Sequence, residues 1–496
     1  MTSPVMINRL ATGVSGLDTV LAGGLPEFSF NLIAGPPGSG KTTLAHQMMF
    51  ALASPERPAL YFTVLGEPAL KMLRYQQQFA FFDAAAINGT IRFINLSDEA
   101  IGGDLDLVLR RIVEEVKAAG PAFVFVDSFR SVIMAGTAEG AQINQLQSFV
   151  QQLGVQMTSW QATTFLIGEY FSETEDNPVF TVADGIFWLR QSLQRNSMVR
   201  KLEIVKMRGQ ATLPGLHTFR ITDAGVTVFA PAERAVTAEP RDIAPSRLQM
   251  GVEGLDAMLG GGLPSGFSLL IAGPSGSGKS ILASSFLAEG ARRGEHGVIA
   301  TFEQNPTRMR NPLLSDLLES PKVTTVDARS RDLSIDEILL LLITEIRRTG
   351  AVRVVIDSLS GLELAVAPTF RDDFRESLAR LVFALSAEGV TLLVTSELED
   401  RYTDLRFSPY GTAFMTDAII VHRYIEVDSR LRRMMAVVKL RGSAHSDEMR
   451  EFTIVDGQII IGTMLESQAG LLSGRPTRQT TAASAAHPDP RGHDDA

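Results

Sequence analysis

A glycine-rich stretch that occurs twice decides the fold: Gly35-Pro36-Pro37-Gly38-Ser39-Gly40-Lys41-Thr42 and Gly273-Pro274-Ser275-Gly276-Ser277-Gly278-Lys279-Ser280. Both stretches follow an apolar run and fit the P-loop pattern, whose glycines let backbone N–H groups converge on phosphate oxygens at the start of a helix. The pattern assigns the lysine to the β- and γ-phosphates and the final hydroxyl to Mg²⁺. We also assign the residues that follow each P-loop, Thr43 and Ile281, to ATP binding. The sequence therefore predicts two sites for ATP and Mg²⁺.

The two P-loops belong to a repeat of a whole domain. The segment 9–18 (RLATGVSGLD) returns as 247–256 (RLQMGVEGLD), an offset of 247 − 9 = 238 residues. An offset of this length indicates a duplicated domain and not a solenoid unit. We predict a first domain at 1–230, a linker rich in Pro, Ala and charge at 231–246, a second domain at 247–465 and a disordered tail at 466–496.

Short apolar runs alternate with longer helical patterns in each repeat. The runs lie at 28–34, 59–65, 122–126, 163–167 and 185–189, and at 267–272, 297–301, 352–356, 391–395 and 418–421. Near-continuous apolar strands separated by helices predict an α/β fold with a parallel sheet covered on both faces. Alternating strands near 201–207, 218–221, 434–440 and 451–454 predict an antiparallel extension of each sheet.

Composition narrows the class of protein. The 496 residues carry a formal net charge of −10 and include no cysteine, which excludes disulfides, thiolate metal sites and cysteine nucleophiles. The acidic balance disfavours general binding to nucleic acid or to an anionic membrane. No apolar run approaches the ~20 residues of a membrane-spanning helix, and the N-terminus has no signal-peptide layout. We therefore expect a cytoplasmic protein.

Two apolar runs end in an Asp-Ser pair, at 123–128 and 354–358. After a P-loop, such a strand is typical of a Walker B motif, in which Asp127 and Asp357 would hold the Mg²⁺ shell. A hydrolase also needs a carboxylate that orients the attacking water. We place it at the end of the strand beside the P-loop strand, which points to Glu67 and Glu303, with surface-loop glutamates as the alternative.

Lysine is rare in this chain. Eight of the 46 basic residues are lysines, which leaves 46 − 8 = 38 arginines. Two of the eight are the P-loop lysines, and two more, Lys206 and Lys439, begin the motifs Lys206-Met207-Arg208-Gly209 and Lys439-Leu440-Arg441-Gly442. Because lysine presents a compact charge to phosphate, its retention at these places favours contact with a nucleotide.

With these motifs in order, the sequence resembles the KaiC family, the cyanobacterial clock ATPases, and the wider RecA-like group around it, over roughly residues 7–464. The resemblance implies two tandem RecA-like domains and a ring homo-oligomer, a hexamer, that acts in signalling. It also implies that each Lys-x-Arg-Gly strand reaches a neighbouring subunit's ATP. Asp223 matches a family aspartate that approaches the neighbour's nucleotide.

The sequence departs from the family at the catalytic strand ends. Where the family has two adjacent glutamates, the first repeat has Gly66-Glu67 and the second has Glu303-Gln304. We therefore expect two sites that are not catalytically equivalent.

A second departure concerns phosphorylation. The adjacent Ser-Thr pair that the family phosphorylates corresponds here to Ala413-Phe414, which has no hydroxyl. The nearby hydroxyls are those of Ser408, Thr412 and Thr416.

Four functions fit these motifs. We favour a ring-forming ATPase that associates with itself and with an unidentified signalling protein. A Ser/Thr autokinase would use one of these three hydroxyls as its acceptor. A RecA-class ATPase acting on DNA would need an aromatic and basic loop, and the nearest segment, 401–407, has mixed charge and is more typical of an interface. The fourth is a scaffold whose ATP is structural.

Overall fold

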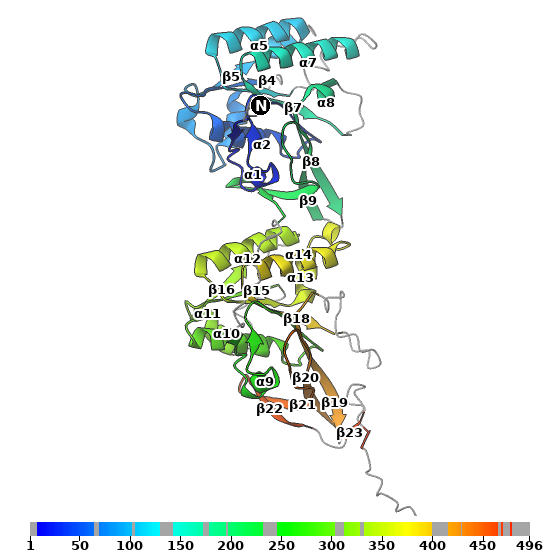
Figure 1. The fold of residues 1–496 in the computed structure, drawn as a ribbon. Coiled ribbons are helices and arrows are strands. Elements are labelled where there is room, and N and C mark those ends of the chain that lie inside the picture. The colour runs from blue at the N-terminus through cyan, green and yellow to red at the C-terminus, as the bar shows by residue number, and fades with distance from the viewer. Residues whose placement is uncertain are drawn as a thin grey trace, which may run out of the picture. The chain divides into compact units, whose positions relative to one another are not determined.

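The computed structural model describes residues 7–63, 69–101, 105–128, 142–171, 178–194, 197–231, 246–302, 312–327, 332–398, 415–427, 429–464, 468–469 and 477–478. The chain divides into two compact units, Met1–Pro231 and Ala232–Ala496, drawn in Figure 1. Most of the predicted linker and most of the predicted tail lie outside the described residues.

A nine-stranded sheet forms the first unit, in the order β11-β10-β9-β8-β3-β7-β6-β4-β5. The central strands are parallel, and β9, β10 and β11 extend the sheet in antiparallel fashion from β8. This confirms the predicted fold class. The strands are β3 (Phe30–Gly35), β4 (Ala59–Thr63), β5 (Ile91–Asn95), β6 (Phe123–Asp127), β7 (Thr163–Glu169), β8 (Gly185–Gln194), β9 (Ser197–Met207), β10 (Leu216–Thr222) and β11 (Gly225–Phe229).

Helices cover both faces of this sheet (Figure 1). Successive residues of β3 point to opposite faces, so Leu32 packs into the core beneath α5 and α7 while Ile33 packs into the core beneath α2. The apolar residues of α5 recur at helical spacing and form one buried stripe. The helices are α1 (Leu17–Val20), α2 (Lys41–Leu52), α3 (Ala69–Gln76), α4 (Ser97–Ile101), α5 (Leu105–Ala119), α7 (Gln142–Ser159) and α8 (Pro178–Val182).

The second unit repeats this architecture, with the sheet order β16-β15-β17-β18-β14-β19-β20-β21-β22. Its strands are β14 (Ser268–Gly273), β15 (Gly297–Thr301), β16 (Val323–Asp327), β17 (Arg353–Asp357), β18 (Thr391–Glu397), β19 (Ala418–Val427), β20 (Arg430–Leu440), β21 (Arg450–Val455) and β22 (Gln458–Met464). Its helices are α9 (Glu253–Met258), α10 (Lys279–Arg292), α11 (Pro312–Glu319), α12 (Ile335–Thr349), α13 (Leu359–Ala365) and α14 (Phe374–Ala387). None of the described helices is long and apolar enough to cross a membrane.

Small ladders complete both units. In the first, β1 (Arg9–Leu10) pairs with β2 (Leu25–Pro26), and in the second, β12 (Arg247–Leu248) pairs with β13 (Leu263–Pro264). Within the predicted tail, β23 (Gln468–Ala469) pairs with β24 (Thr477–Arg478). The segments that revealed the repeat in the sequence therefore form the same ladder in each unit.

Candidate nucleotide site

The first P-loop lies between the end of β3 at Gly35 and the start of α2 at Lys41. Gly40 precedes the helix with φ +101°, and a Cβ atom there would come within 2.6 Å of Ile221 Cδ1. Only glycine fits this turn without strain. The residues that we predicted to cradle phosphate, Gly35, Gly38, Ser39 and Gly40 among them, thus occupy a turn between a strand and the start of a helix, the kind of place at which backbone N–H groups bind anions.

Lys41 is buried at the base of this turn, and its Nζ donates to the carbonyl of Pro36 at 2.9 Å. Burial lowers the pKa of Lys41, while the carboxylates of Glu169 and Asp127 raise it. A buried lysine gains from an arriving phosphate, because a nearby negative charge favours the charged form that burial disfavours.

The predicted Mg²⁺ residues of the first unit meet directly. Thr42 Oγ1 donates to Asp127 Oδ2 at 2.8 Å, and the hydroxyl of Tyr61 donates to the same oxygen at 2.7 Å. Burial raises the pKa of Asp127, and the bonds from Tyr61 and Thr42 oppose that rise. Burial and the charge of Asp127 raise the pKa of Tyr61, so its hydroxyl keeps the proton that it donates.

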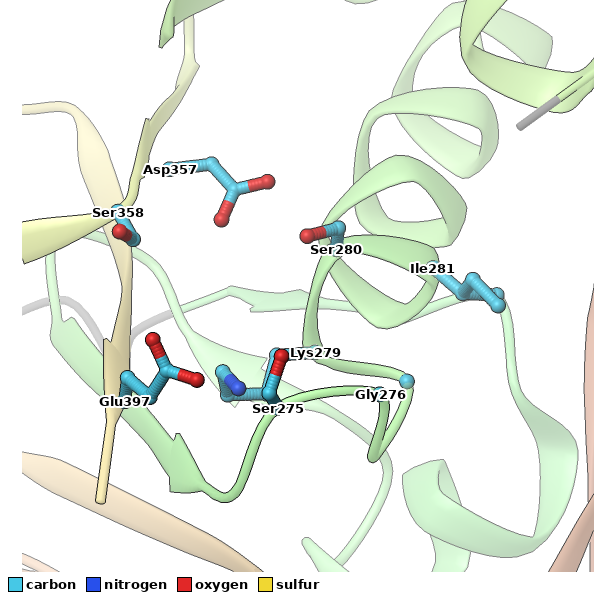
Figure 2. Close-up of a pocket in the computed structure, with 9 residues that line it drawn as sticks. Ser275, Gly276, Lys279, Ser280, Ile281, Asp357, Ser358 and Glu397 are labelled. Atoms are coloured by element: carbon cyan, nitrogen blue, oxygen red, sulfur yellow. The ribbon is translucent and has the colours of Figure 1, made fainter. Parts of the chain in front are cut away.

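The second P-loop borders a cavity of about 270 Å³ (Figure 2), lined by Ser275, Gly276, Gly278, Lys279, Ser280, Ile281, Asp357, Ser358 and Glu397. In Figure 2 the carboxylate of Asp357 faces the hydroxyl of Ser280, and that of Glu397 turns toward Lys279. Lys279 Nζ donates to the carbonyls of Gly273 and Pro274, each at 2.9 Å. The predicted Lys279, Ser280 and Asp357 therefore all line one cavity.

The ligand set suits Mg²⁺. In each unit a hydroxyl and a carboxylate lie together, and Mg²⁺ prefers one or two such oxygens together with phosphate oxygens and water. In the described part of the chain, no three His, Cys, Asp or Glu side chains gather into a group that could hold a metal by themselves. A Mg²⁺ ion at this place would take its remaining ligands from phosphate oxygens and water.

One placement in the sequence analysis is wrong. We predicted that the strand before Glu67 lies beside the P-loop strand, but β4 is separated from β3 by β7 and β6, and β15 is separated from β14 in the same way. Strands that come later in the chain insert between them. Glu67 and Glu303 themselves lie outside the described residues.

Other glutamates end the strands that do lie beside the P-loop strands. Glu169 ends β7 and pairs in register with Gly35, and Glu397 ends β18 and pairs with Gly273. Sequence reasoning missed both residues. A signal was present, because an apolar run in each repeat ends in a small residue followed by glutamate, Gly168-Glu169 and Ser396-Glu397.

The first Lys-x-Arg-Gly motif and its own P-loop lie at opposite ends of strand β3. Lys206 Nζ donates to the carbonyls of Phe180 at 3.1 Å and Thr181 at 3.0 Å. Arg208 Nη1 donates to Asp184 Oδ1 at 3.1 Å, and Asp184 Oδ2 accepts from the backbone N–H of Phe30 at 3.0 Å. Phe30 begins β3, whereas the P-loop follows its last residue.

The second motif repeats this arrangement. Lys439 Nζ donates to the carbonyl of Thr416 at 2.5 Å, and Arg441 Nη1 lies 3.5 Å from Asp417 Oδ1. Asp417 Oδ2 accepts from the backbone N–H of Ser268, the first residue of β14, at 3.0 Å. Burial lowers the pKa of Lys206 and of Lys439, and the neighbouring arginine lowers it further. The middle residues differ in exposure, because Leu440 is buried and Met207 is partly buried.

Asp223 lies apart from Lys206 and Arg208. It sits in the exposed turn between β10 and β11. The side chain of Ile221, two residues before Asp223, lies against the Gly40 turn. Gly225, two residues after Asp223, lies against Gln47 of α2. Asp223 therefore lies beside its own P-loop helix, and the structure does not bring it together with the rest of the predicted trans set.

Most residues of the phosphorylation analysis lie outside the described residues, namely Ser408, Thr412, Ala413 and Phe414. Thr416 is described and is 3% exposed. It directly precedes Asp417, at the end of the sheet opposite its own P-loop.

Fold and site together define a protein with two tandem RecA-like P-loop ATPase domains. The chain belongs to the KaiC family, because the model of the KaiC ATPase family matches residues 10–233 and again residues 248–466. It is 26% identical over 486 residues to the circadian clock oscillator protein KaiC of a Picosynechococcus species, covering 95% of this chain and 93% of that protein. It is 27% identical to KaiC of Synechococcus elongatus, covering 96% and 93%. It is 25% identical to KaiC 1 of a Synechocystis species, covering 95% and 92%.

Proposed function

We propose that this protein hydrolyses ATP in a ring-shaped homo-oligomer, a hexamer, whose nucleotides lie at the interfaces between subunits. The observation that carries the proposal is the separation of each Lys-x-Arg-Gly motif from its own P-loop. From Phe30 to Gly35 is five residues of strand, and at about 3.3 Å per residue this spans roughly 16 Å. The same five-residue span separates Ser268 from Gly273.

Side chains anchored at one end of these strands cannot reach a phosphate at the other end. A nucleotide that Lys206 and Arg208 contact would therefore be held by a different subunit, and the same applies to Lys439 and Arg441. A site that a neighbour completes couples nucleotide binding to assembly. Because the two surfaces in such a contact differ, the contact is heterologous and closes into a ring when the rotation allows.

Within each site the chain's own residues take separate roles. The backbone N–H groups of the P-loop and Lys41 or Lys279 hold the phosphates. Thr42 with Asp127, and Ser280 with Asp357, would hold Mg²⁺, which when bound would neutralise charge on the phosphate oxygens. The neighbour's arginine then adds a cation opposite the P-loop, as positioned charges stabilise phosphoryl transfer.

Two pairs of glutamates are candidates for the carboxylate that orients the attacking water. Glu67 and Glu303 remain our proposal, from the family resemblance of the segments in which they occur. Glu397 is a second candidate because it lines the cavity beside Lys279. Glu169 is its counterpart in the first unit because it pairs with Gly35 as Glu397 pairs with Gly273.

The alternatives gain less support. Thr416 is buried and lies at the far end from its own P-loop, so phosphorylation there would need a neighbour's nucleotide and an opened strand end. The segment 401–407, on which a DNA-acting function would rest, lies outside the described residues. The proposal also includes a cytoplasmic location and a signalling protein as partner.

Size-exclusion chromatography with light scattering, with and without ATP and Mg²⁺, tests the proposal. We expect a subunit of 53.8 kDa to convert to a ring of several subunits only when nucleotide and Mg²⁺ are both present. A monomer that hydrolyses ATP at its full rate would contradict the interface site.

A further inference from the structure

The two Walker B aspartates are held from opposite sides. In the first unit the hydroxyl of Tyr61 on β4 donates to Asp127 at 2.7 Å. In the second unit the hydroxyl of Thr395 on β18 donates to Asp357. The strands β4 and β15 flank one side of the Walker B strand, and β7 and β18 flank the other, so the donor has changed sides between the units.

Strand register shows that the change is an exchange of residues at matching positions. Tyr61 pairs with Phe125, two residues before Asp127, and Ile299 pairs with Val355, two residues before Asp357. Tyrosine in the first unit thus stands where the second has isoleucine.

On the other side, Ile167 pairs with Asp127. In the second unit Val394 pairs with Ile356, which puts Thr395 beside Asp357. The residues that pair directly with the aspartates on the β4 and β15 side are threonines in both units, Thr63 and Thr301. The two positions that differ hold one hydroxyl side chain that donates to the aspartate and one isoleucine, in reversed order.

The two aspartates also differ in how many hydrogen bonds one carboxylate oxygen accepts. In the first unit Tyr61 and Thr42 both donate to Asp127 Oδ2. In the second unit Thr395 donates to Asp357 Oδ1, and no hydrogen bond between Asp357 and Ser280 is found among the described residues. Ser280 and Asp357 both border the open cavity instead (Figure 2).

An oxygen that already accepts two hydrogen bonds has less negative charge to offer a cation or a water bound to it. We propose that Tyr61 and Thr395 are positioning residues that set the magnesium requirement of their sites, so that the first site needs more Mg²⁺ to hold nucleotide than the second. This inference rests on the proposed nucleotide sites and adds a difference between them that follows from the side chains around each aspartate.

The packing around Tyr61 makes the hydroxyl separable from the ring. The ring is fully buried and contacts His46, Phe93 and Phe125, with centroids 4.6, 5.2 and 6.0 Å away. Tyr61→Phe keeps these contacts and removes only the donor to Asp127.

The test uses full-length protein with one P-loop disabled, Lys279→Ala to leave the first site and Lys41→Ala to leave the second. Binding of a fluorescent, non-hydrolysable ATP analogue is followed as Mg²⁺ is added. We expect the midpoint in Mg²⁺ to be higher for the first site, by roughly 10- to 150-fold, the size expected for one hydrogen bond to a charged acceptor.

Variants of the first site then identify the cause. We expect Tyr61→Phe, and the double exchange Tyr61→Ile with Ile167→Thr, to lower the midpoint to about that of the second site. Tyr170→Phe, which alters another buried tyrosine of the same unit, serves as the matched control and should leave the midpoint unchanged.

Equal midpoints for the two sites, or a Tyr61→Phe midpoint that stays the same or rises, would overturn the inference while leaving the nucleotide sites standing. Failure of both single-site proteins to bind the analogue would refute the proposed sites and the inference with them.

Discussion

Replacing Arg208 with alanine separates the stability of the first unit from assembly. Within the subunit, Arg208 makes an ion pair with Asp184 at 3.1 Å, and their side chains are 58% and 30% exposed. Exposed pairs of this kind contribute about 0.2–1 kcal/mol to folding, because water and side-chain entropy offset most of the attraction. A domain of this size loses about 2–4 °C in Tm per kcal/mol, so we expect the Tm of Arg208→Ala to fall by no more than about 4 °C.

The effect on assembly should be much larger. If Arg208 meets a neighbour's phosphate, the variant loses a hydrogen bond between two charged groups at each interface, worth about 1.5–3 kcal/mol. A tenfold change in affinity corresponds to about 1.4 kcal/mol, so each contact should weaken by roughly 10- to 150-fold. The ATP and protein concentrations needed for assembly should rise accordingly.

Light scattering across a dilution series at fixed ATP and Mg²⁺ measures this shift, and thermal unfolding without nucleotide measures the folding cost. Arg92→Ala is the matched control, because Arg92 also makes a surface ion pair, with Glu115 at 3.3 Å, on the distant edge strand β5. An Arg208→Ala protein that assembles over the same concentration range as the control would refute the trans role.

The remaining predictions concern nucleotide content, turnover and acid stability. Lys41→Ala and Lys279→Ala should each reduce bound nucleotide from two per chain to one, as measured by chromatography of the released nucleotide, and two per chain in both variants would contradict the assignment. In single-site proteins, Glu67→Gln and Glu303→Gln should retain ATP and abolish phosphate release, whereas loss of turnover only in Glu169→Gln and Glu397→Gln would transfer the water-orienting role to those residues. Burial lowers the pKa of His46 to about 4 and that of His422 to about 3, below the usual ~6.5 of an unfolded chain, so the unfolded state takes up protons first as pH falls. Stability should therefore decline from pH 6.5 toward pH 4, by about 2 kcal/mol per histidine at pH 5, and a urea midpoint that stays constant between pH 7 and pH 5 would contradict this.

Local spacing made the strands and the P-loops predictable. The runs that we expected around each P-loop and each Walker B aspartate are strands in the structure, because a buried strand in a parallel sheet is apolar on both faces. The edge strand β5 escaped prediction because its five residues form neither a continuous apolar run nor a strict alternation, with Ile91 buried and Arg92 exposed. Its partner in the second unit, β16, includes two threonines and an aspartate and gave an equally weak signal.

Side-by-side placement of strands was harder to predict than the strands themselves. The sequence gives no direct sign that β7, which comes late in the first unit, inserts beside β3 and moves β4 two places away. For this reason Glu169 and Tyr61 were missed although both lie close to predicted residues. Asp184 and Asp417 were missed for another reason, since each looks like an ordinary turn residue until its two hydrogen-bonded partners are known.

The roughly 16 Å between each Lys-x-Arg-Gly motif and its own P-loop has a consequence for incomplete assemblies. If every nucleotide is completed by the next subunit, an open arc always ends in one P-loop that no cation faces, so an arc of n chains has n − 1 finished sites in each repeat. The last subunit to join supplies two contacts at once and finishes two sites per repeat where each earlier addition finished one. Closure is then favoured over growth of the arc, and a solution of this protein should contain single chains and closed rings with few species between them.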